Sequence, residues 1–418
     1  MKKAMDIASL ISLQPASDET APSTMPSDQP AFRDDDYSAA HGESLRQTLD
    51  LDTWRPGIDL TQMYAVLEQE VAEAVRKEGE YIHEIRTKIF PRLRLRPGAP
   101  PGAGVFQVPV GRLEEVHRQV LFNGAVEACD GTVVTHDTLP VTITQIGVCL
   151  VSYRGDQGSW VHRIFRRDLR ASSGKSAVEE TLELLEHRNR RTGVDQKSPR
   201  DRLTELARRG ILEYAERAVL LDRSDARWRL GHGSPVTFQL LTGSGMLELV
   251  QASLVLLRRL ILDHRRFVFV PSAPSAREIL TIGNALRPLE YAIVDTPLDA
   301  LLSVADGGYR GEGWGPVGKD VKCFVKEVGP RIVVGVYRVS HLAPAQMFYA
   351  HVDHAHDAAL IAMADSALQE HRGFPLLVDL ADKLCTASFG GETLAASTRL
   401  AYAAAGAPYR YLAERKTR

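Results

Sequence analysis

The chain has few cysteines, no large surplus of either charge and no uninterrupted apolar run long enough to cross a membrane. Its four cysteines include no CxxC pair, which argues against a zinc knuckle or a disulfide framework and favours a reducing compartment. The net charge is −2 over 418 residues, so any contact with nucleic acid must use a local basic patch or a partner. We therefore expect a cytoplasmic protein that makes no membrane contact.

Two apolar segments bear on membrane insertion or export. The stretch Leu247–Leu262 is the longest, but polar side chains interrupt it at Glu248, Gln251, Arg258 and Arg259. The short apolar run near the N-terminus is broken by Asp6 and is not followed by a clean small-residue cleavage site. Neither segment therefore predicts insertion or secretion.

The first part of the chain predicts a tail followed by a helical arm. Residues 1–50 are predicted to be disordered, because Ser, Pro, Asp and Thr dominate from residue 13 onward and no apolar periodicity is present. Within residues 51–93, apolar side chains recur at helical spacing between Asp59, which can cap a helix, and Pro91, which can end it. This long N-terminal helical arm either packs on the core or joins a dimer or partner.

The remainder, residues 107–418, predicts an α/β core in which a mixed sheet is flanked by helices. Residues 124–154 are rich in β-branched side chains and predict strands. Beyond them, segments with strand and helix patterns alternate, which is typical of a sheet with helices on its faces. Among the individual elements we expect a loop at 154–176, strands at 321–327 and 331–339, and a terminal strand at 409–412.

One aspartate stands where a strand is expected. Asp130-Gly131-Thr132 lies inside the β-branched segment, although a charge within a strand opposes both β-propensity and burial. Such violations of local rules concentrate at functional sites, and divalent cations take oxygen ligands. The alternative is that Asp130-Gly131 forms a turn between two shorter strands.

Two further segments carry candidate site residues. The predicted helix 202–220 contains Glu205, Glu213 and Glu216, and Glu213 lies beside the apolar stripe, so it can point inward. The alternative is a solvated helix face with salt bridges. The sequence WRLGHGSP then places His232 just after a short predicted strand, either at a site or in an exposed turn.

The order of these blocks resembles the NurA family of DNA-end-processing nucleases. The blocks are the strand with Asp130-Gly131-Thr132, the helix pattern R-x-x-L-x-E-L-x-x-R-x-x-x-E from Arg200 to Glu213, a strand ending in glycine, and GFPLLVDLA at Gly373–Ala381. The resemblance covers roughly residues 60–418 in architecture. It implies an RNase H-like fold, a metal-dependent DNA nuclease acting on ends or single strands, Mn²⁺ or Mg²⁺ as cofactor, a HerA-type hexameric ATPase as partner, and a homodimer.

The resemblance also implies a site. Asp130 matches the first aspartate of the family's manganese site, and Glu213 matches the helix glutamate. The chain departs from the family at the second Asp-Gly motif, where His232-Gly233 stands, and imidazole can bind manganese. It departs again at the late histidine, where Asp379 and Asp382 are hard ligands of a different kind. The implied metal ligands are therefore Asp130, Glu213, Asp379 and Asp382, with His232 as a ligand or proton shuttle.

Two other interpretations stay open. The departures are also those expected of a catalytically degenerate NurA-like subunit that serves as a DNA-binding scaffold for the ATPase. A more distant hypothesis is a metal hydrolase built on the cluster His351–Asp357, although a strand-to-helix junction there would point its histidines in different directions. The segment Ser173–Ser176 ends like a phosphate-binding loop, but Leu169 replaces the first glycine of that motif.

Arginines gather in the middle third of the sequence. They form clusters at 163–170, 188–191, 200–209 and 258–266. The planar guanidinium group binds phosphate well, and several such contacts would make DNA affinity salt-dependent. Alternatively, the clusters are solvated helix faces paired with the many glutamates.

Overall fold

The computed structural model describes residues 34–54, 57, 60–137, 141–154, 160–168, 178–179, 182, 206–274, 276–307 and 315–409. The chain divides into two compact units, Met1–Glu73 and Ala74–Arg418, and the boundary falls inside helix α3 (Thr61–Glu84). The predicted tail before residue 34, the first residues of the predicted helix 202–220 and the last residues of the predicted strand 409–412 lie outside the described residues.

The first unit contains two short helices, α1 (Asp34–His41) and α2 (Leu45–Leu49), within the segment that the sequence predicts to be a disordered tail. Helix α2 begins with a capping box, in which the Gln47 backbone N–H donates to the Ser44 hydroxyl at 3.2 Å and the Ser44 N–H donates to the Gln47 side chain at 3.1 Å. No residue of α2 is buried, so this helix depends on local hydrogen bonds.

Helix α3 continues through a π turn, Ile85–Ile89, and a 3₁₀ turn, Phe90–Arg92, so residues 61–92 are helical throughout. No residue of α3 is buried. Its large exposed apolar side chains are Met63, Tyr64, Val66, Leu67, Val71, Val75 and Tyr81. The role of this helix as an arm for a dimer or partner stays a prediction.

The second unit is built on a sheet of nine strands in its described part, in the order β1-β7-β8-β9-β6-β5-β2-β3-β4. The strands are β1 (Gly104–Gln107), β2 (Val126–Asp137), β3 (Val141–Val151), β4 (Trp160–Asp168), β5 (Trp228–His232), β6 (Phe267–Val270), β7 (Glu290–Asp295), β8 (Ile332–Arg338) and β9 (Gln346–His351). Strands β2, β5 and β6 run parallel, and the other neighbours are antiparallel. This confirms the predicted α/β class with a mixed sheet.

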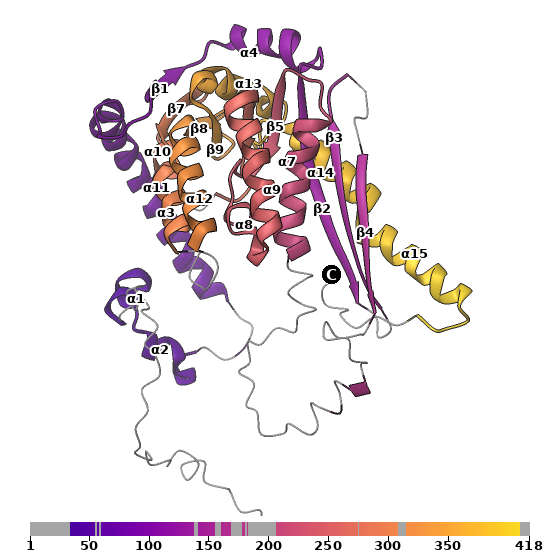
Figure 1. The fold of residues 1–418 in the computed structure, drawn as a ribbon. Coiled ribbons are helices and arrows are strands. Elements are labelled where there is room, and N and C mark those ends of the chain that lie inside the picture. The colour runs from indigo at the N-terminus through magenta and orange to yellow at the C-terminus, as the bar shows by residue number, and fades with distance from the viewer. Residues whose placement is uncertain are drawn as a thin grey trace, which may run out of the picture. The chain divides into compact units, whose positions relative to one another are not determined.

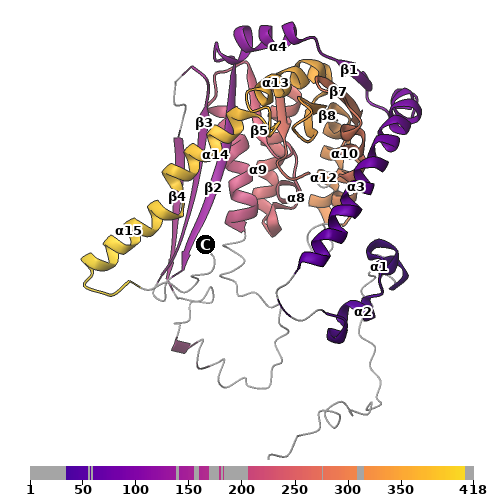
Figure 2. The ribbon, with the colours of Figure 1, turned by 180° about the vertical axis from the view of Figure 1, so that it is seen from behind.

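Helices cover both faces of this sheet. In the described residues after α3, the α-helices of the second unit are α4 (Val110–Val116), α7 (Leu212–Asp222), α8 (Phe238–Thr242), α9 (Leu247–Arg258), α10 (Arg277–Asn284), α11 (Leu298–Gly307), α12 (Gly315–Val328), α13 (Ala355–Ala367), α14 (Leu376–Phe389) and α15 (Gly391–Ala404). Figure 1 shows α7, α8, α9 and α12 on the near face, and Figure 2 shows α13, α14 and α15 on the opposite face. Each face has its own cluster of buried apolar side chains. The site described below lies where β2 is held between α7 and α14.

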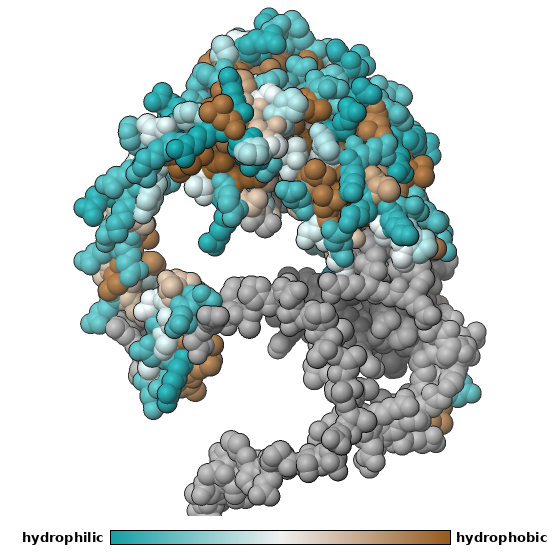
Figure 3. Space-filling view, turned by 60° about the vertical axis from the view of Figure 1, so that its left-hand side comes forward, coloured by the Kyte–Doolittle hydropathy of each residue, from teal (hydrophilic) through white to brown (hydrophobic). Residues whose placement is uncertain are grey.

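The surface has a mixed character. Figure 3 shows apolar side chains interspersed among hydrophilic ones on the face it draws. Such mixing is ordinary for a protein surface. No helix among the described residues has both the length and the apolar character that a membrane crossing needs.

The prediction of a strand at 321–327 is wrong, because this segment belongs to helix α12. Its β-branched residues favour a strand, but its buried side chains are Val321, Phe324, Val325 and Val328. That spacing is the signature of one helix face, and packing of this face decides the structure over local propensity.

The prediction of a loop at 154–176 is wrong for Trp160–Asp168, which form β4. Strand β4 pairs with β3 and is the outermost strand on that side among the described residues. Charged side chains are typical of edge strands, where they discourage further pairing, so the arginines that suggest a loop are compatible with a strand.

Helix α13 carries a buried carboxylate, Asp365, whose residue is 0% exposed. The Tyr153 hydroxyl donates to its Oδ1 at 2.5 Å, and the Leu377 backbone N–H donates to its Oδ2 at 2.9 Å. Burial raises the pKa of Asp365 from its ordinary 3.8 to about 6, although both hydrogen bonds oppose this shift. The folded protein therefore favours the protonated form more than the unfolded chain does.

Replacing this group should change how stability depends on pH. Because the folded-state pKa lies above the unfolded one, the contribution of Asp365 to stability is present below pH 3.8 and is lost as pH rises through about 6. Between pH 3.8 and about 6, the free energy of unfolding of the wild type should fall by about 2 kcal/mol more than that of Asp365→Asn. Urea denaturation across the window measures it, with Asp306→Asn, an exposed carboxylate paired with Lys322, as control. Parallel profiles for wild type and Asp365→Asn would contradict the assignment.

Candidate active site

Asp130 lies in the middle of β2, so the predicted position inside a strand is confirmed and the alternative of a turn is wrong. It pairs in register with Cys149 of β3. On the other side of β2, parallel pairing with β5 ends at Cys129 and Gly231, so Asp130 is the first residue beyond that pairing. Its residue is 7% exposed, and its Oδ1 accepts a 2.9 Å hydrogen bond from the Gly131 N–H. The Asp130 carboxylate therefore lies at the point where β5 stops pairing with β2.

Gly131 lets helix α7 approach the strand closely. A Cβ atom at this position would lie 2.6 Å from Leu212 Cδ1 and 2.9 Å from Glu216 Oε1. Both distances are shorter than real Cβ contacts, so a side chain here would displace the ends of the Leu212 and Glu216 side chains. The glycine after Asp130 is explained by space for Glu216.

Substituting this glycine should disturb both stability and the site. We expect Gly131→Ala to destabilise the protein by about 1–3 kcal/mol, because the added methyl overpacks the contact with α7. It should also displace Glu216 from β2. Urea denaturation measures the first effect, and Gly111→Ala is the matched control because open space surrounds that glycine. Equal stability of Gly131→Ala and wild type would show that α7 yields without cost.

His232 ends strand β5 and faces Asp130. Its Nδ1 lies 3.6 Å from Asp130 Oδ1, and its side chain is 36% exposed. The neighbouring Asp130 carboxylate raises the pKa of His232, with Glu216 adding to the effect and burial opposing it. The other ring nitrogen, Nε2, lies 2.8 Å from the Ser272 hydroxyl. The predicted candidates Asp130 and His232 are thus brought together.

Ser272 is a site residue that the sequence does not identify. It stands just after β6, as His232 stands at the end of β5, and Asp130 stands past the paired part of β2. These three parallel strands are neighbours, and ligands of α/β sheets bind at the carboxyl ends of such strands. The signal that could have found Ser272 is therefore its place after a buried strand.

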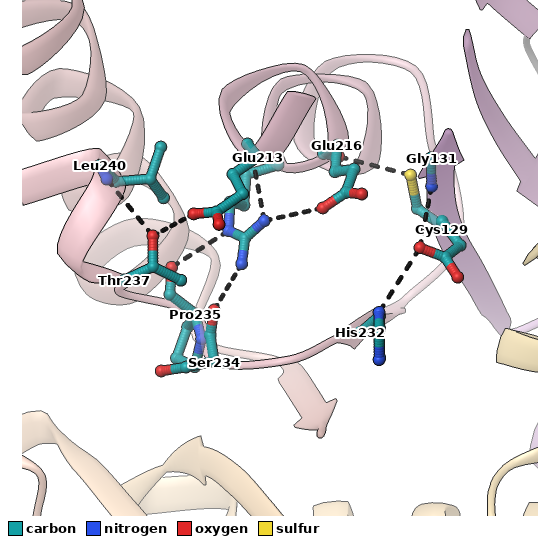
Figure 4. A network of polar contacts seen from close by, with 11 residues as sticks. Cys129, Gly131, Glu213, Glu216, His232, Ser234, Pro235, Thr237 and Leu240 are labelled. Atoms are coloured by element: carbon teal, nitrogen blue, oxygen red, sulfur yellow. Dashed lines mark hydrogen bonds and ion pairs between the residues drawn. The ribbon is translucent and has the colours of Figure 1, made fainter. Parts of the chain in front are cut away.

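Glu216 is the α7 carboxylate that faces the strand (Figure 4). Its side chain is 14% exposed, and its Oε2 accepts a 2.9 Å hydrogen bond from the Arg217 guanidinium. Burial, together with the charge of Asp130, raises the pKa of Glu216 to about 7, although Arg217 and His232 oppose the shift. The sequence offers Glu216 among three glutamates but gives no reason to prefer it.

Glu213, the glutamate that the family resemblance favours, is turned toward Thr237 instead (Figure 4). The Thr237 hydroxyl donates to Glu213 Oε2, and the same hydroxyl caps helix α8. Burial raises the pKa of Glu213, and Arg217 and Thr237 oppose the shift. A role for Glu213 as a metal ligand stays a prediction, while its contacts in the structure tie α7 to α8.

Helix α14 brings its two aspartates to different surroundings. Asp379 accepts from Arg372 at 2.6 Å and from Gln369 at 2.7 Å, so its Oδ2 is already engaged in an ion pair. Asp382 lies on the surface, but the loss of part of its hydration raises its pKa, and the charge of Asp130 adds to this shift. Asp382 is thus the α14 carboxylate that feels Asp130, while a ligand role for Asp379 stays a prediction.

The histidines of the His351–Asp357 cluster point in different directions. His351 is 1% exposed and accepts from the Asp353 N–H, whereas His356 Nδ1 lies 2.7 Å from the Tyr291 hydroxyl and His354 packs edge-on against Trp228. Nowhere in the described part of the chain do three His, Cys, Asp or Glu side chains lie close enough, as placed, to hold a metal ion. The hypothesis of a metal hydrolase on this cluster finds no support.

The described arginines at 258–266 are partly paired with carboxylates. Arg258 contacts Glu327 at 3.0 Å and Arg259 contacts Asp222 at 2.5 Å, both on exposed surface. These pairs match the interpretation of solvated, salt-bridged helix faces for this cluster. The cluster at 188–191 and the first part of the cluster at 200–209, residues 200–205, lie outside the described residues.

Comparison with known proteins gives likenesses in structure alone. No protein-family model and no curated protein matches the chain. Among solved structures, the NurA nuclease from Sulfolobus solfataricus is 10% identical, with a TM-score of 0.38 over 78% of this chain and 91% of that one. NurA with manganese is 10% identical (TM-score 0.35, covering 78% and 97%), and NurA bound to dAMP and manganese is 9% identical (TM-score 0.35, covering 77% and 92%). At these identities and TM-scores the likeness does not establish an activity for this chain.

Proposed function

We propose that this protein is a metal-dependent DNA nuclease that hydrolyses phosphodiester bonds at DNA ends or in single strands. The observation that carries the proposal is the approach of His232 Nδ1 to within 3.6 Å of Asp130 Oδ1 where β5 stops pairing with β2, with Glu216 near enough for its charge to act on both. Carboxylates and an imidazole beside the carboxyl ends of parallel strands are groups that phosphodiester hydrolysis with a divalent cation can use.

The donor types fit Mn²⁺ or Mg²⁺. Carboxylate oxygens are preferred by hard cations, and imidazole is accepted by manganese. Burial and, after it, the charge of Asp130 raise the pKa of both Glu216 and Asp382, so the acidic groups add to one another's cost of being charged. A cation relieves such repulsion. The gap of 3.6 Å between Asp130 Oδ1 and His232 Nδ1 is also about the spacing of two ligands that share one cation.

In this proposal Asp130 and His232 hold the cation, and Glu216 and Asp382 supply the further carboxylates. A bound divalent cation lowers the pKa of water and neutralises charge on the scissile phosphate. Arg217 keeps Glu216 in place through its hydrogen bond to Oε2. The alternative role of His232 is that of a proton shuttle, in which its partly exposed imidazole takes or returns a proton at the open edge of the site.

The substrate and partners are proposed from the family resemblance. DNA is the substrate, a HerA-type hexameric ATPase feeds it to the site, the fold is RNase H-like, and the protein works as a homodimer. Helix α3 offers an apolar surface for assembly, because its apolar side chains are exposed. A reducing, cytoplasmic setting agrees with four cysteines that are all free.

Cleavage of labelled linear DNA tests the proposal. Purified protein is incubated with single-stranded and duplex substrates in the presence of Mn²⁺, Mg²⁺ or EDTA, with and without the ATPase. We expect products that require the cation. Retention of DNA without cleavage under every condition would instead indicate a catalytically degenerate subunit that serves the ATPase as a DNA-binding scaffold.

A further inference from the structure

Ser272 contacts the imidazole of His232 from the bend that follows a separate strand, β6. Its hydroxyl lies 2.8 Å from His232 Nε2, and its side chain is exposed. Strand β6, which precedes it, is buried at all four residues and pairs with β5 and β9. The backbone of Ser272 is therefore anchored close to the sheet core while its hydroxyl reaches the site.

We propose that Ser272 is a positioning residue that holds His232 with Nδ1 toward Asp130 and allows the imidazole to change tautomer when a divalent cation binds. This inference rests on the proposed function, since it concerns the same site. It assigns a role to a residue outside the sequence-derived set of Asp130, Glu213, His232, Asp379 and Asp382.

The chemistry of neutral imidazole supplies the argument. One ring nitrogen carries a hydrogen and the other a lone pair. Without a cation, the Asp130 carboxylate accepts hydrogen bonds only, so the hydrogen of His232 belongs on Nδ1 and Nε2 must accept from Ser272. With a cation at Asp130, Nδ1 must present its lone pair, and the hydrogen moves to Nε2, which then donates to Ser272.

Only a group that both donates and accepts can serve both states. The serine hydroxyl does so by rotating about its C–O bond, whereas a carboxylate would only accept and an ammonium group would only donate. The separation of 3.6 Å between Nδ1 and Asp130 Oδ1 is longer than an ordinary hydrogen bond, so the carboxylate attracts the hydrogen on Nδ1 electrostatically without fixing the ring. Ser272 is then the contact that keeps the ring oriented in either state.

Loss of this contact should weaken cation binding. Partners that orient a ligating histidine typically change metal affinity by about 10–100-fold when they are removed. We expect Ser272→Ala to lower Mn²⁺ affinity by a factor within this range in calorimetric titrations. Ser272→Thr keeps the hydroxyl and should restore the affinity.

Histidine tautomers are read directly from two-bond ¹H–¹⁵N spectra of full-length protein labelled at histidine nitrogens. The titrant is MgCl₂, which is diamagnetic, at alkaline pH where imidazole is neutral. Signals of His232 are assigned by their absence in His232→Gln. In wild type the hydrogen should move from Nδ1 to Nε2 as Mg²⁺ is added, and in Ser272→Ala the ring should populate both tautomers.

The outcomes separate this inference from the proposed function. If His232 of wild type does not respond to Mg²⁺ and Mn²⁺ does not bind, the metal-dependent function fails, and the inference fails with it. If wild type responds and Ser272→Ala shows the same affinity and the same tautomers, the inference alone is overturned. Thr281→Ala is the control, because that exposed hydroxyl bonds within its own helix α10, to the Arg277 carbonyl.

Discussion

Asp130→Asn should abolish cation-dependent DNA cleavage while leaving the protein folded. The amide keeps the size of the side chain and can still accept from the Gly131 N–H, but it removes the charge at the centre of the site. A carboxylate that holds a catalytic cation contributes several kcal/mol to the transition state, so we expect a loss of roughly 10³-fold in rate. Initial rates on labelled linear DNA with Mn²⁺ measure the loss.

A matched variant shows whether the effect belongs to the site. Asp306→Asn also removes one carboxylate, but at an exposed position on α11 paired with Lys322, and its cleavage rate should equal that of wild type. Thermal denaturation confirms that both variants are folded. Substantial cation-dependent cleavage by Asp130→Asn would contradict the site and direct attention away from β2.

Arg217→Met should cause a large loss of stability, because it breaks a buried ion pair. The guanidinium group is 2% exposed and donates to Glu216 Oε2 at 2.9 Å and to the carbonyls of Glu213, Ser234 and Pro235. It also lies 5.5 Å from the centre of the Phe269 ring. Removing one partner of a buried ion pair leaves the other uncompensated, so the free energy of unfolding should fall by about 3–5 kcal/mol.

The same substitution on exposed surface provides the comparison. Arg259→Met breaks a pair with Asp222 in which both side chains are nearly half exposed, and it should cost less than about 1 kcal/mol. Urea denaturation of both variants measures the difference. A loss in Arg217→Met no greater than that in Arg259→Met would mean that Glu216 is not held by this ion pair.

The fold class follows from the sequence, because strand and helix periodicities alternate clearly through most of the second unit. The errors arise where composition and burial pattern disagree. In α12 the valines favour a strand, yet the spacing of Val321, Phe324 and Val328 is helical. In β4 the arginines suggest a loop, because an edge strand tolerates charges that a central strand does not.

The site is only partly accessible from the sequence. A carboxylate within a predicted strand distinguishes Asp130 by local rules alone. The spacing of residues on the helix does not decide between Glu213 and Glu216. The choice depends on which of them packs against Gly131 of β2, and that is Glu216. Ser272 follows a buried strand, but its role is shown only by its contact with His232 at the end of the neighbouring strand β5. Residues identified by contact across the sheet therefore require the three-dimensional structure.

The arrangement of the site along β2, β5 and β6 has a consequence for folding. Asp130, His232 and Ser272 come from strands far apart in the sequence that pair in parallel, and parallel pairing needs long crossover connections. Contacts of high sequence separation form slowly, since loop closure must precede any stabilisation. The site therefore comes into existence only when the central strands have assembled, and no contiguous fragment that ends before β6 contains it.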